Sequence, residues 1–157
     1  MILHSTEALK HYTESGHWGR RTLLDLLRET AAKAPERPAV VDPADRPDLT
    51  GTAARSLSYR ELSAAVDAIA TGLLDMGLRK DEIVVVQLPN VWELVAMFLA
   101  VSRAGGVLSP MPIQWRDNEF QNVKNLTEAR FFFGMRDFKG ADQMAIAEKT
   151  GFVRSEE

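Results

Sequence analysis

The chain has 157 residues, which is enough for one domain with a hydrophobic core and too few for two ordinary domains. Its formal net charge of −3 and its content of 45% hydrophobic and 26% charged residues are typical of a globular protein, and they provide no basic surface for nucleic acids or anionic membranes. The absence of cysteine excludes disulfides, thiolate metal sites and cysteine nucleophiles.

The polar start of the chain carries all three histidines, His4, His11 and His17. Their spacing matches no standard metal-ligand pattern, so we expect histidines of a solvated loop and keep a zinc site as the alternative. Residues 1–7 do not resemble a secretory signal, and the longest strongly apolar run, residues 94–101, is too short to span a membrane. We therefore expect a cytoplasmic protein.

The first predicted helix begins after Thr22, which can cap the first turn, and Asp25 suits the positive end of the helix dipole. An apolar stripe at helical spacing follows, and Pro35 ends the helix. Residues 38–42 then predict a short strand. Residues 43–54 are rich in Pro, Asp, Gly and Thr, and they predict an exposed hairpin loop.

A capping box marks the start of the second predicted helix. The Ser58 hydroxyl is expected to bond forward while the Glu61 carboxylate reaches back. Gly77 occupies the position of a left-handed C-cap residue. The apolar face of this helix consists of Leu62, Ala65, Val66, Ile69, Ala70, Leu73 and Leu74.

Residues 83–88 form a continuous β-branched run, which is typical of a strand covered on both faces in a parallel sheet. Asn90 is predicted to cap the next helix, with Glu93 at its third position. Residues 94–101 are apolar nearly all round, which indicates a well-buried helix. The glycine pair at 105–106 is interpreted as a C-cap and tight turn that ends it.

Three further elements follow a short second strand at residues 107–109. Asp117 is predicted to cap a third helix of this region, and residues 130–133 to form a third strand. A weaker helix is predicted for residues 142–148.

The predicted order from residue 83 is strand, helix, strand, helix, strand. Residues 89–106 and 111–129 are long enough for helical crossovers, so we predict a layered α/β fold with a mostly parallel, doubly wound sheet. We divide the chain into a lead-in at residues 1–21, the domain at 22–149 and a polar tail at 150–157.

No set of residues is complete for catalysis. The glycine pair at 105–106 follows a helix, where carbonyl groups repel phosphate, and the sequence contains no glycine-rich phosphate loop and no nucleophile elbow. Ser58 and Ser109 have structural explanations in a cap and a strand end. We therefore predict no catalytic, cofactor-binding or metal-binding residue in this chain.

Other polar and aromatic residues also have a functional and a structural interpretation. Asp81 and Glu82 are adjacent carboxylates, for which a solvated pair is favoured over acid–base chemistry. Trp92 and Trp115 could line an acyl pocket, although packing is favoured. Arg103 near a helix end suits the helix dipole.

Several segments together resemble the adenylate-forming enzymes, a family of acyl- and aryl-CoA synthetases, luciferases and peptide-synthetase adenylation domains. Residues 57–62 (Leu-Ser-Tyr-Arg-Glu-Leu) resemble the family's first core motif, and residues 99–110 resemble its second, in which a helix ends at Ala-Gly and a strand leads to proline. Residues 85–90 with Glu93 resemble the strand-turn-helix between them. Glu119-Phe120 and residues 128–130 resemble the family's next helix and strand. Tyr12, Gly16-His17-Trp18 and residues 22–25 resemble the lead-in of aryl- and alicyclic-acid CoA ligases.

This resemblance spans residues 10–142 and implies the N-terminal subdomain of an ATP-dependent acid–CoA ligase. Such enzymes join a carboxylic acid to ATP, release pyrophosphate and pass the acyl group from AMP to CoA. In family members the phosphate loop ending in Pro-Lys-Gly, the aromatic–Thr–Glu motif, the ribose-binding Asp and the Lys of the C-terminal domain all lie downstream of the core motifs quoted above, and they are absent from the corresponding part of this chain. The resemblance therefore implies the carboxylic acid, ATP, Mg²⁺ and CoA only for a complete enzyme, and we expect no activity from this chain alone.

Two alternatives come from other functional classes. The chain could be a non-catalytic interaction or oligomerisation module, in which an exposed apolar face or sheet edge pairs with a partner or with a second copy. It could also be a free-standing α/β domain for a small ligand, although it lacks a glycine-rich loop. The sequence leaves the identity of the carboxylic acid open.

Overall fold

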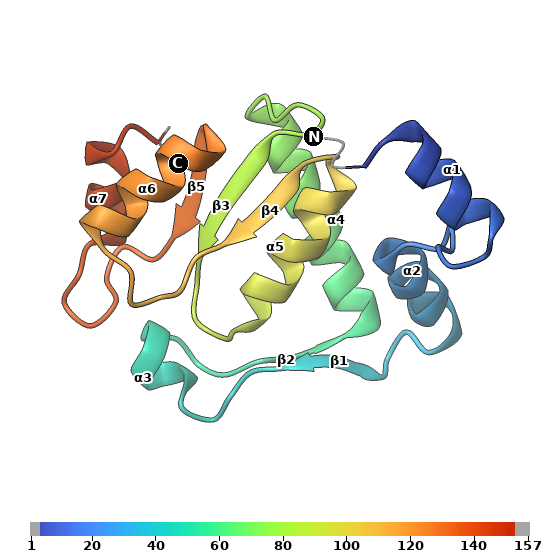
Figure 1. Cartoon of the computed structure of the whole chain (residues 1–157). Helices are drawn as coiled ribbons and strands as arrows, with labels where there is room; N and C mark the ends of the chain where they lie inside the picture. Colours follow the sequence, from blue (N-terminus) through green and yellow to red (C-terminus); the bar gives the residue numbers. More distant parts are fainter. Residues whose placement is uncertain (1–3, 153–157) are drawn as a thin grey trace.

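The computed structural model describes residues 4–152, and its helices and strands form an α/β fold (Figure 1). The elements in chain order are α1 (Thr6–Glu14), α2 (Leu23–Lys33), β1 (Pro38–Val41), α3 (Arg46–Thr50), β2 (Ser56–Ser58), α4 (Tyr59–Asp75), β3 (Ile83–Gln87), α5 (Trp92–Arg103), β4 (Val107–Pro110), α6 (Asp117–Thr127), β5 (Phe131–Gly134) and α7 (Gln143–Lys149).

The central sheet consists of three parallel strands in the order β4-β3-β5, which confirms the predicted parallel α/β fold. Val84 of β3 lies opposite Leu108 of β4 and Phe131 of β5. Helices cover both faces of the sheet, because Val84 and Val86 pack with α4 and α5 whereas Val85 packs with α6 and α7. Each of these three valines has 0% of its surface exposed, which explains why the strand is apolar without alternation.

A second, antiparallel sheet of β1 and β2 packs against α4 and α5 (Figure 1). Ala39 and Val40 of β1 contribute to the same hydrophobic cluster as the buried faces of α4 and α5. The strand β2 was not predicted, because three residues are too short to show a period. Figure 1 shows this small sheet running across the lower ends of α4 and α5.

The helix-capping predictions are confirmed for α2 and α4. The Thr22 and Ser58 side chains accept hydrogen bonds from the backbone N–H groups of Asp25 and Glu61. In turn, the carboxylates of Asp25 and Glu61 accept hydrogen bonds from the backbone N–H groups of Thr22 and Ser58. Gly77 follows the C-terminal end of α4 with φ of +81°, in the left-handed region that favours glycine.

The predicted cap of α5 is wrong. Val91, and not Asn90, occupies the N-cap position, and the Trp92 backbone N–H donates to Asp42 Oδ1 at 2.8 Å. The first turn of α5 is thus capped by a carboxylate from the end of β1. A local pattern around Asn90 cannot encode this bond, since its acceptor is distant in the sequence.

The predicted cap of α6 is displaced by one residue. Asp117 is the first residue of the helix, and Arg116 precedes it as the N-cap. The Arg116 backbone N–H donates to Glu119 Oε2 at 3.0 Å. Asp117 therefore contributes a negative charge to the first turn without being the cap.

Two segments predicted as loops contain helices. The lead-in contains α1, which begins after Ser5, whose side chain accepts from the Ala8 N–H at 3.1 Å. His11 consequently lies in a helix and not in a loop. The predicted exposed hairpin loop contains α3, and Arg46 in this helix is buried.

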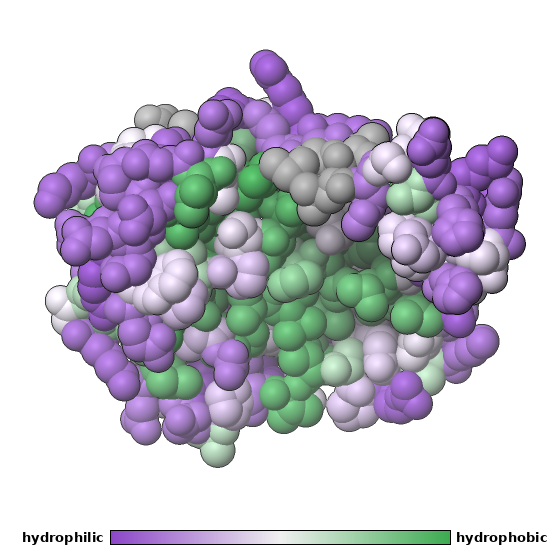
Figure 2. All heavy atoms as spheres, viewed as in Figure 1, coloured by the Kyte–Doolittle hydropathy of each residue, from purple (hydrophilic) through white to green (hydrophobic). Residues whose placement is uncertain are grey.

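The helix α5 is less buried than its sequence predicts. Its inner face is buried, but 40% of Val95 and 44% of Phe98 are exposed. Apolar side chains gather in the centre of one face of the molecule (Figure 2). The predicted burial is therefore confirmed for one side of the helix only.

Phe152 lies in the range predicted as a polar tail, yet it is only 5% exposed. Its ring centroid lies 6.4 Å from that of Phe120 and 5.7 Å from that of Phe132. The rest of the predicted tail, residues 153–157, lies outside the described residues. Between residues 4 and 152, no helix is both long and apolar enough to cross a membrane.

Candidate functional site

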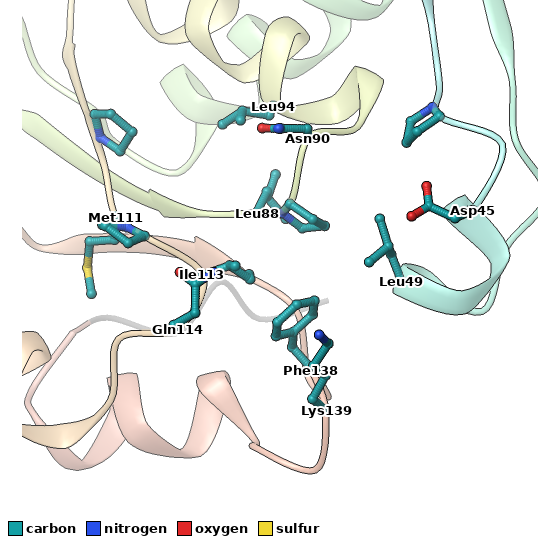
Figure 3. A pocket seen from close by; sticks show the side chains of 14 residues that line it. Asp45, Leu49, Leu88, Asn90, Leu94, Met111, Ile113, Gln114, Phe138 and Lys139 are labelled. Atoms are coloured by element: carbon teal, nitrogen blue, oxygen red, sulfur yellow. The ribbon is translucent and has the colours of Figure 1, made fainter.

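A crevice of about 700 Å³ lies at the carboxyl edge of the parallel sheet (Figure 3). Its walls are residues 88–90 after β3, residues 110–114 at the end of β4 and beyond it, and residues 138–139 after β5. The helix α3 and the residues before it close the opposite side. Ligands of open α/β sheets bind outside the carboxyl ends of the strands. This position and volume make the crevice the candidate binding site.

The crevice has apolar walls with a few polar side chains. Asp45, Asn90, Gln114 and Lys139 line it, and the Lys139 Nζ lies 5.6 Å from the ring centroid of Phe138. No serine, cysteine or histidine lines this crevice, so it has no such nucleophile beside a base. Among the described residues, no group of three or more His, Cys, Asp or Glu side chains could hold a metal ion. Asp45 and Lys139 are the ionisable side chains in its lining.

Two buried glutamines hold the loop between β4 and α6. Gln87 Nε2 donates to the carbonyl oxygens of Pro112 and Trp115 at 2.8 and 3.1 Å. Gln143 Nε2 donates to the Ile113 carbonyl of this loop at 3.4 Å, and its Oε1 accepts from the backbone N–H of Met135 at 3.0 Å, which joins α7 to the end of β5. Neither glutamine stands out as structural in the sequence, although a glutamine at the end of an apolar strand is a usable signal, because most buried amides form hydrogen bonds.

An ionic cluster of Asp42, Arg46 and Glu93, here called the Arg46 cluster, joins α3 to the first turn of α5. Arg46 Nη1 donates to Asp42 Oδ2 at 2.7 Å and to Glu93 Oε2 at 2.8 Å, and Nη2 donates to Glu93 Oε1 at 2.6 Å. The exposed fractions of the three side chains are 0%, 5% and 32%. Arg46 was missed in the sequence because its neighbours predict only a loop.

The Arg46 cluster shifts two ionisation equilibria. Burial alone would raise the pKa of Asp42, but the backbone N–H groups of Trp92 and Arg55 and the Arg46 guanidinium together hold that pKa below its usual value. The pKa of Arg46 is raised, chiefly by its hydrogen bonds to Glu93. Asp42 and Arg46 are thus both charged at neutral pH, which suits a structural ion pair.

A second ionic contact accounts for one of the two adjacent carboxylates. Glu82 accepts from Arg130 Nε and Nη2, both at 3.1 Å, and from the backbone N–H of Arg79 at 2.7 Å. The Arg130 hydrogen bonds, followed by the Arg79 bond, lower the pKa of Glu82. Asp81 has a positive φ of 65° at this turn. Glu82 therefore acts as a structural acceptor between β3 and β5, and not as half of an acid–base pair.

The tryptophans lie away from the walls of the crevice. Trp92 packs against the core formed by α4 and α5, with the Arg55 guanidinium 5.2 Å from its ring centroid. Trp115 is 38% exposed and holds the glutamine-bonded loop through its carbonyl. Neither residue lines the crevice, so its lining does not support an acyl-pocket role. The surroundings of Trp92 agree with the packing interpretation, whereas the exposed side chain of Trp115 does not.

The remaining singled-out residues have structural surroundings. Arg103 Nε lies 2.8 Å from Asp67 Oδ1 at the end of α5. Gly105 has φ of +84°, and a Cβ on Gly106 would lie 3.1 Å from the side chains of Leu78 and Val101. The interpretation of the glycine pair as a tight turn is therefore confirmed.

The histidines of the lead-in lie near aromatic rings. The ring centroid of His4 is 5.0 Å from that of Trp18, and Tyr12 stacks on Trp18 at 4.9 Å. His17 Nδ1 lies 2.8 Å from Ser15 Oγ on the exposed turn after α1. These contacts are local, and none of the lead-in residues lines the crevice.

Comparison with known proteins relates this geometry to a family. Residues 27–155 match the profile of the AMP-binding enzymes, a range that includes the whole parallel sheet. The chain belongs to this family. AMP-binding enzymes are adenylate-forming, so the resemblance seen in the core motifs is confirmed.

The AMP-binding relatives of this chain include ligases of aromatic and fatty acids. The chain is 33% identical over 138 residues to the 2-hydroxy-7-methoxy-5-methyl-1-naphthoate–CoA ligase of Streptomyces carzinostaticus, covering 88% of this chain and 23% of that protein. It is 30% identical over 128 residues to the medium-chain fatty-acid–CoA ligase of Escherichia coli, covering 82% and 21%. The chain thus spans less than a quarter of the length of these two relatives.

Solved AMP-binding structures share the fold. The apo structure of Mycobacterium smegmatis MbtA matches with a TM-score of 0.68 and 26% identity, covering 84% of this chain and 23% of that one. The N-terminal subdomain of Klebsiella oxytoca NpsA, in complex with 3-hydroxyanthranilyl-AMSN, matches with a TM-score of 0.62 and 22% identity, covering 87% and 33%. The fold is therefore that of the N-terminal subdomain of an adenylate-forming enzyme.

Proposed function

We propose that the chain is the N-terminal part of an ATP-dependent acid–CoA ligase and has no ligase activity by itself. The observation that carries the proposal is the match of residues 27–155 to the AMP-binding enzymes, together with similarity to two CoA ligases over more than four fifths of the chain. The second half of the proposal is supported by the extent of the chain, which spans 23% and 21% of the two CoA ligases, and by the lack of a phosphate loop ending in Pro-Lys-Gly.

The complete enzyme would work in two steps. The carboxylate of the acid attacks the α-phosphorus of ATP, so that an acyl-adenylate forms and pyrophosphate leaves. The thiol of CoA then attacks the acyl carbonyl, loses its proton and displaces AMP, which yields the thioester. Mg²⁺ and cationic groups would stabilise the negative charge on the phosphates. The described residues would contribute the parallel sheet and its flanking helices, and carboxylic acid, ATP and CoA would bind the whole enzyme.

The test is acid-dependent exchange of pyrophosphate into ATP. The 157-residue chain should give no exchange above background with medium-chain fatty acids or aromatic acids, whereas the full-length ligase of Escherichia coli serves as the active control. Clear exchange from the chain alone, dependent on the added acid, would show that the proposal of inactivity is wrong.

A second candidate function is a non-catalytic module that self-associates. The observation that favours it is an exposed apolar surface on α2 and α5, lined by Leu23, Leu94, Val95, Phe98 and Leu99. Exposed apolar surfaces of this kind often mark interaction sites. We expect concentration-dependent dimerisation in light scattering, lost in Phe98→Glu and kept in Leu126→Glu, whose wild-type side chain is 85% exposed on α6. A strictly monomeric wild-type chain would contradict this candidate.

We also propose a cytoplasmic location and no nucleic-acid partner. The small negative net charge of −3 supports the second point, since nucleic-acid binding draws on clustered positive charge. Cell fractionation and a filter-binding assay with duplex DNA and RNA at low salt test these two statements. Retention in the membrane fraction or salt-sensitive binding would contradict them.

A further inference from the structure

The segment of residues 43–52, which contains α3, is separated from the rest of the molecule by hollows. Three cavities of about 700, 400 and 410 Å³ each have residues of this segment on one side. On the other side, all three have residues of the turn at 135–140, and the first two also have residues that follow β3. Protein interiors are normally close-packed, so a segment bordered by three hollows has few apolar contacts to hold it.

Polar bonds fix this segment in its place. Arg46 donates through both terminal nitrogens to Glu93 at the start of α5 and through Nη1 to Asp42. Among residues 4–152, the other polar side-chain bonds of the segment stay within it: Thr50 Oγ1 lies 2.7 Å from Thr52 Oγ1 and 3.2 Å from the Arg46 carbonyl. The two-point contact of Arg46 with Glu93 therefore joins the segment to α5.

The ends of the segment are held independently of this contact. Val41 at the end of β1 pairs with Ser56 of β2, and the Asp42 N–H donates to the Arg55 carbonyl at 2.9 Å. Gly51 follows α3 with φ of +71°, a left-handed conformation that glycine adopts readily because it has no Cβ. The segment can consequently move as a loop between two paired strands without loss of either sheet.

We propose that residues 43–52 form a lid over the crevice at the carboxyl edge of the sheet, held closed by the two-point salt bridge from Arg46 to Glu93. In the closed state, Leu49 faces the crevice alongside Leu88 and Phe138 (Figure 3). Glu93 is 32% exposed, so water can compete for its carboxylate and the salt bridge can break without unfolding the core. Opening then gives a small molecule access to the apolar walls.

Native-state hydrogen exchange on the intact 157-residue chain, read by mass spectrometry, tests the lid. In the wild type, the amides of residues 43–54 should exchange through a local opening whose rate hardly changes at low urea concentrations. The amides of β3 should exchange only through global unfolding, whose rate rises steeply with urea. Exchange of residues 43–54 and β3 with one common urea dependence would overturn the proposal.

Two variants and a matched control test whether the Arg46–Glu93 salt bridge holds the lid closed. Glu93→Gln should accelerate exchange of residues 43–54 by about tenfold, and exchange of β3 by a similar factor, because the bond is lost both in the local opening and in global unfolding. Arg46→Lys should act in the same direction, because lysine cannot donate in the two-point geometry of arginine. Glu36→Gln removes a comparable carboxylate that pairs with Arg60 on an exposed surface, and it should leave residues 43–54 unchanged. If Glu93→Gln and Glu36→Gln accelerate the exchange of residues 43–54 equally, or if Glu93→Gln does not accelerate it, then Glu93 does not hold the lid closed.

Discussion

The core around β3 and the edge around α3 are stabilised by different forces. Val85, Phe120 and Phe132 in the core are buried to 2% exposure or less, and they contact one another across the sheet and its helices. At the edge, by contrast, the buried side chain is Arg46, and its partners are carboxylates. Apolar contacts are numerous and individually weak, whereas the ionic cluster consists of a few strong bonds that depend on distance and direction.

This difference predicts different consequences of mutation. In the core, the loss of one side chain leaves a cavity whose cost is proportional to its volume. At the edge, the loss of one charge leaves its partner buried without compensation. The core should therefore respond to changes of size, and the edge to isosteric changes of charge.

Truncation of Phe120 is expected to have the largest effect. Its ring lies 5.1 Å from that of Phe132, and its exposed fraction is 0%. Phe120→Ala should lower the free energy of unfolding by about 3–5 kcal/mol, measured by urea denaturation followed by circular dichroism. The control Leu126→Ala changes an 85% exposed residue on the same helix and should cost less than about 0.5 kcal/mol. Similar losses in the two variants would mean that the α6 side of the sheet is not a packed core.

Removal of the Asp42 charge tests the edge. Asp42→Asn keeps the size of the side chain but weakens the bonds to Arg46 and to the Trp92 N–H. We expect a loss of about 3 kcal/mol in the same urea experiment, because Arg46 remains buried with a weaker partner. Asp45→Asn changes an exposed carboxylate close by, and it should be nearly neutral. An equal, small effect of both variants would show that the ionic cluster contributes no more than a surface pair.

The elements predicted correctly from the sequence are those whose signals are local. Ser58 and Glu61 are three residues apart, and their capping box is determined by that spacing alone. The β-branched run of β3 indicates a strand covered on both faces, whatever the helices that cover it. These two features place α4 and β3, and the order of the remaining strands and helices then follows from the crossover rules.

The features that were missed depend on contacts distant in the sequence. Asn90 looks like a cap, but Asp42 occupies that role because folding brings the end of β1 to the start of α5. Arg46 is buried against Asp42 and Glu93 although the composition of its segment predicts a loop. The exposed side of α5, with Val95 and Phe98, was also not predicted. A helix that is apolar all round has no polar face in its sequence to indicate which side remains exposed.

The candidate site was only indirectly predictable. The parallel strand order implies a crevice at the carboxyl edge, and Gln87 marks the end of β3 by its polarity. Which loops meet there depends on the positions of residues 110–114 and 138–139 relative to α3. No spacing in the sequence relates these segments to one another.

Acid should weaken the edge in a way that identifies Asp42. Its pKa in the folded chain lies below the usual value of 3.8, so ionised Asp42 stabilises the folded state. This contribution is complete above pH 3.8 and is lost as the pH falls through the lower, folded-state pKa. The difference in unfolding free energy between the wild type and Asp42→Asn should therefore be constant near neutral pH and shrink below 3.8. A difference that does not change down to complete acid unfolding would mean that the Asp42 charge does not supply the stability.

Loss of a helix cap should have the smallest effect on the free energy of unfolding. Its size should differ between α4, which packs on the sheet, and α1, which is peripheral. Ser58 caps α4, which has four buried residues, whereas Ser5 caps α1, which has none. Ser58→Ala should lower the global unfolding free energy by about 1 kcal/mol, because α4 unfolds together with the sheet. Ser5→Ala removes the same kind of bond but should leave the global value unchanged, since fraying of α1 uncovers no core. Urea denaturation of the two variants measures both values, and an equal loss would show that α1 folds cooperatively with the sheet despite its exposed surface.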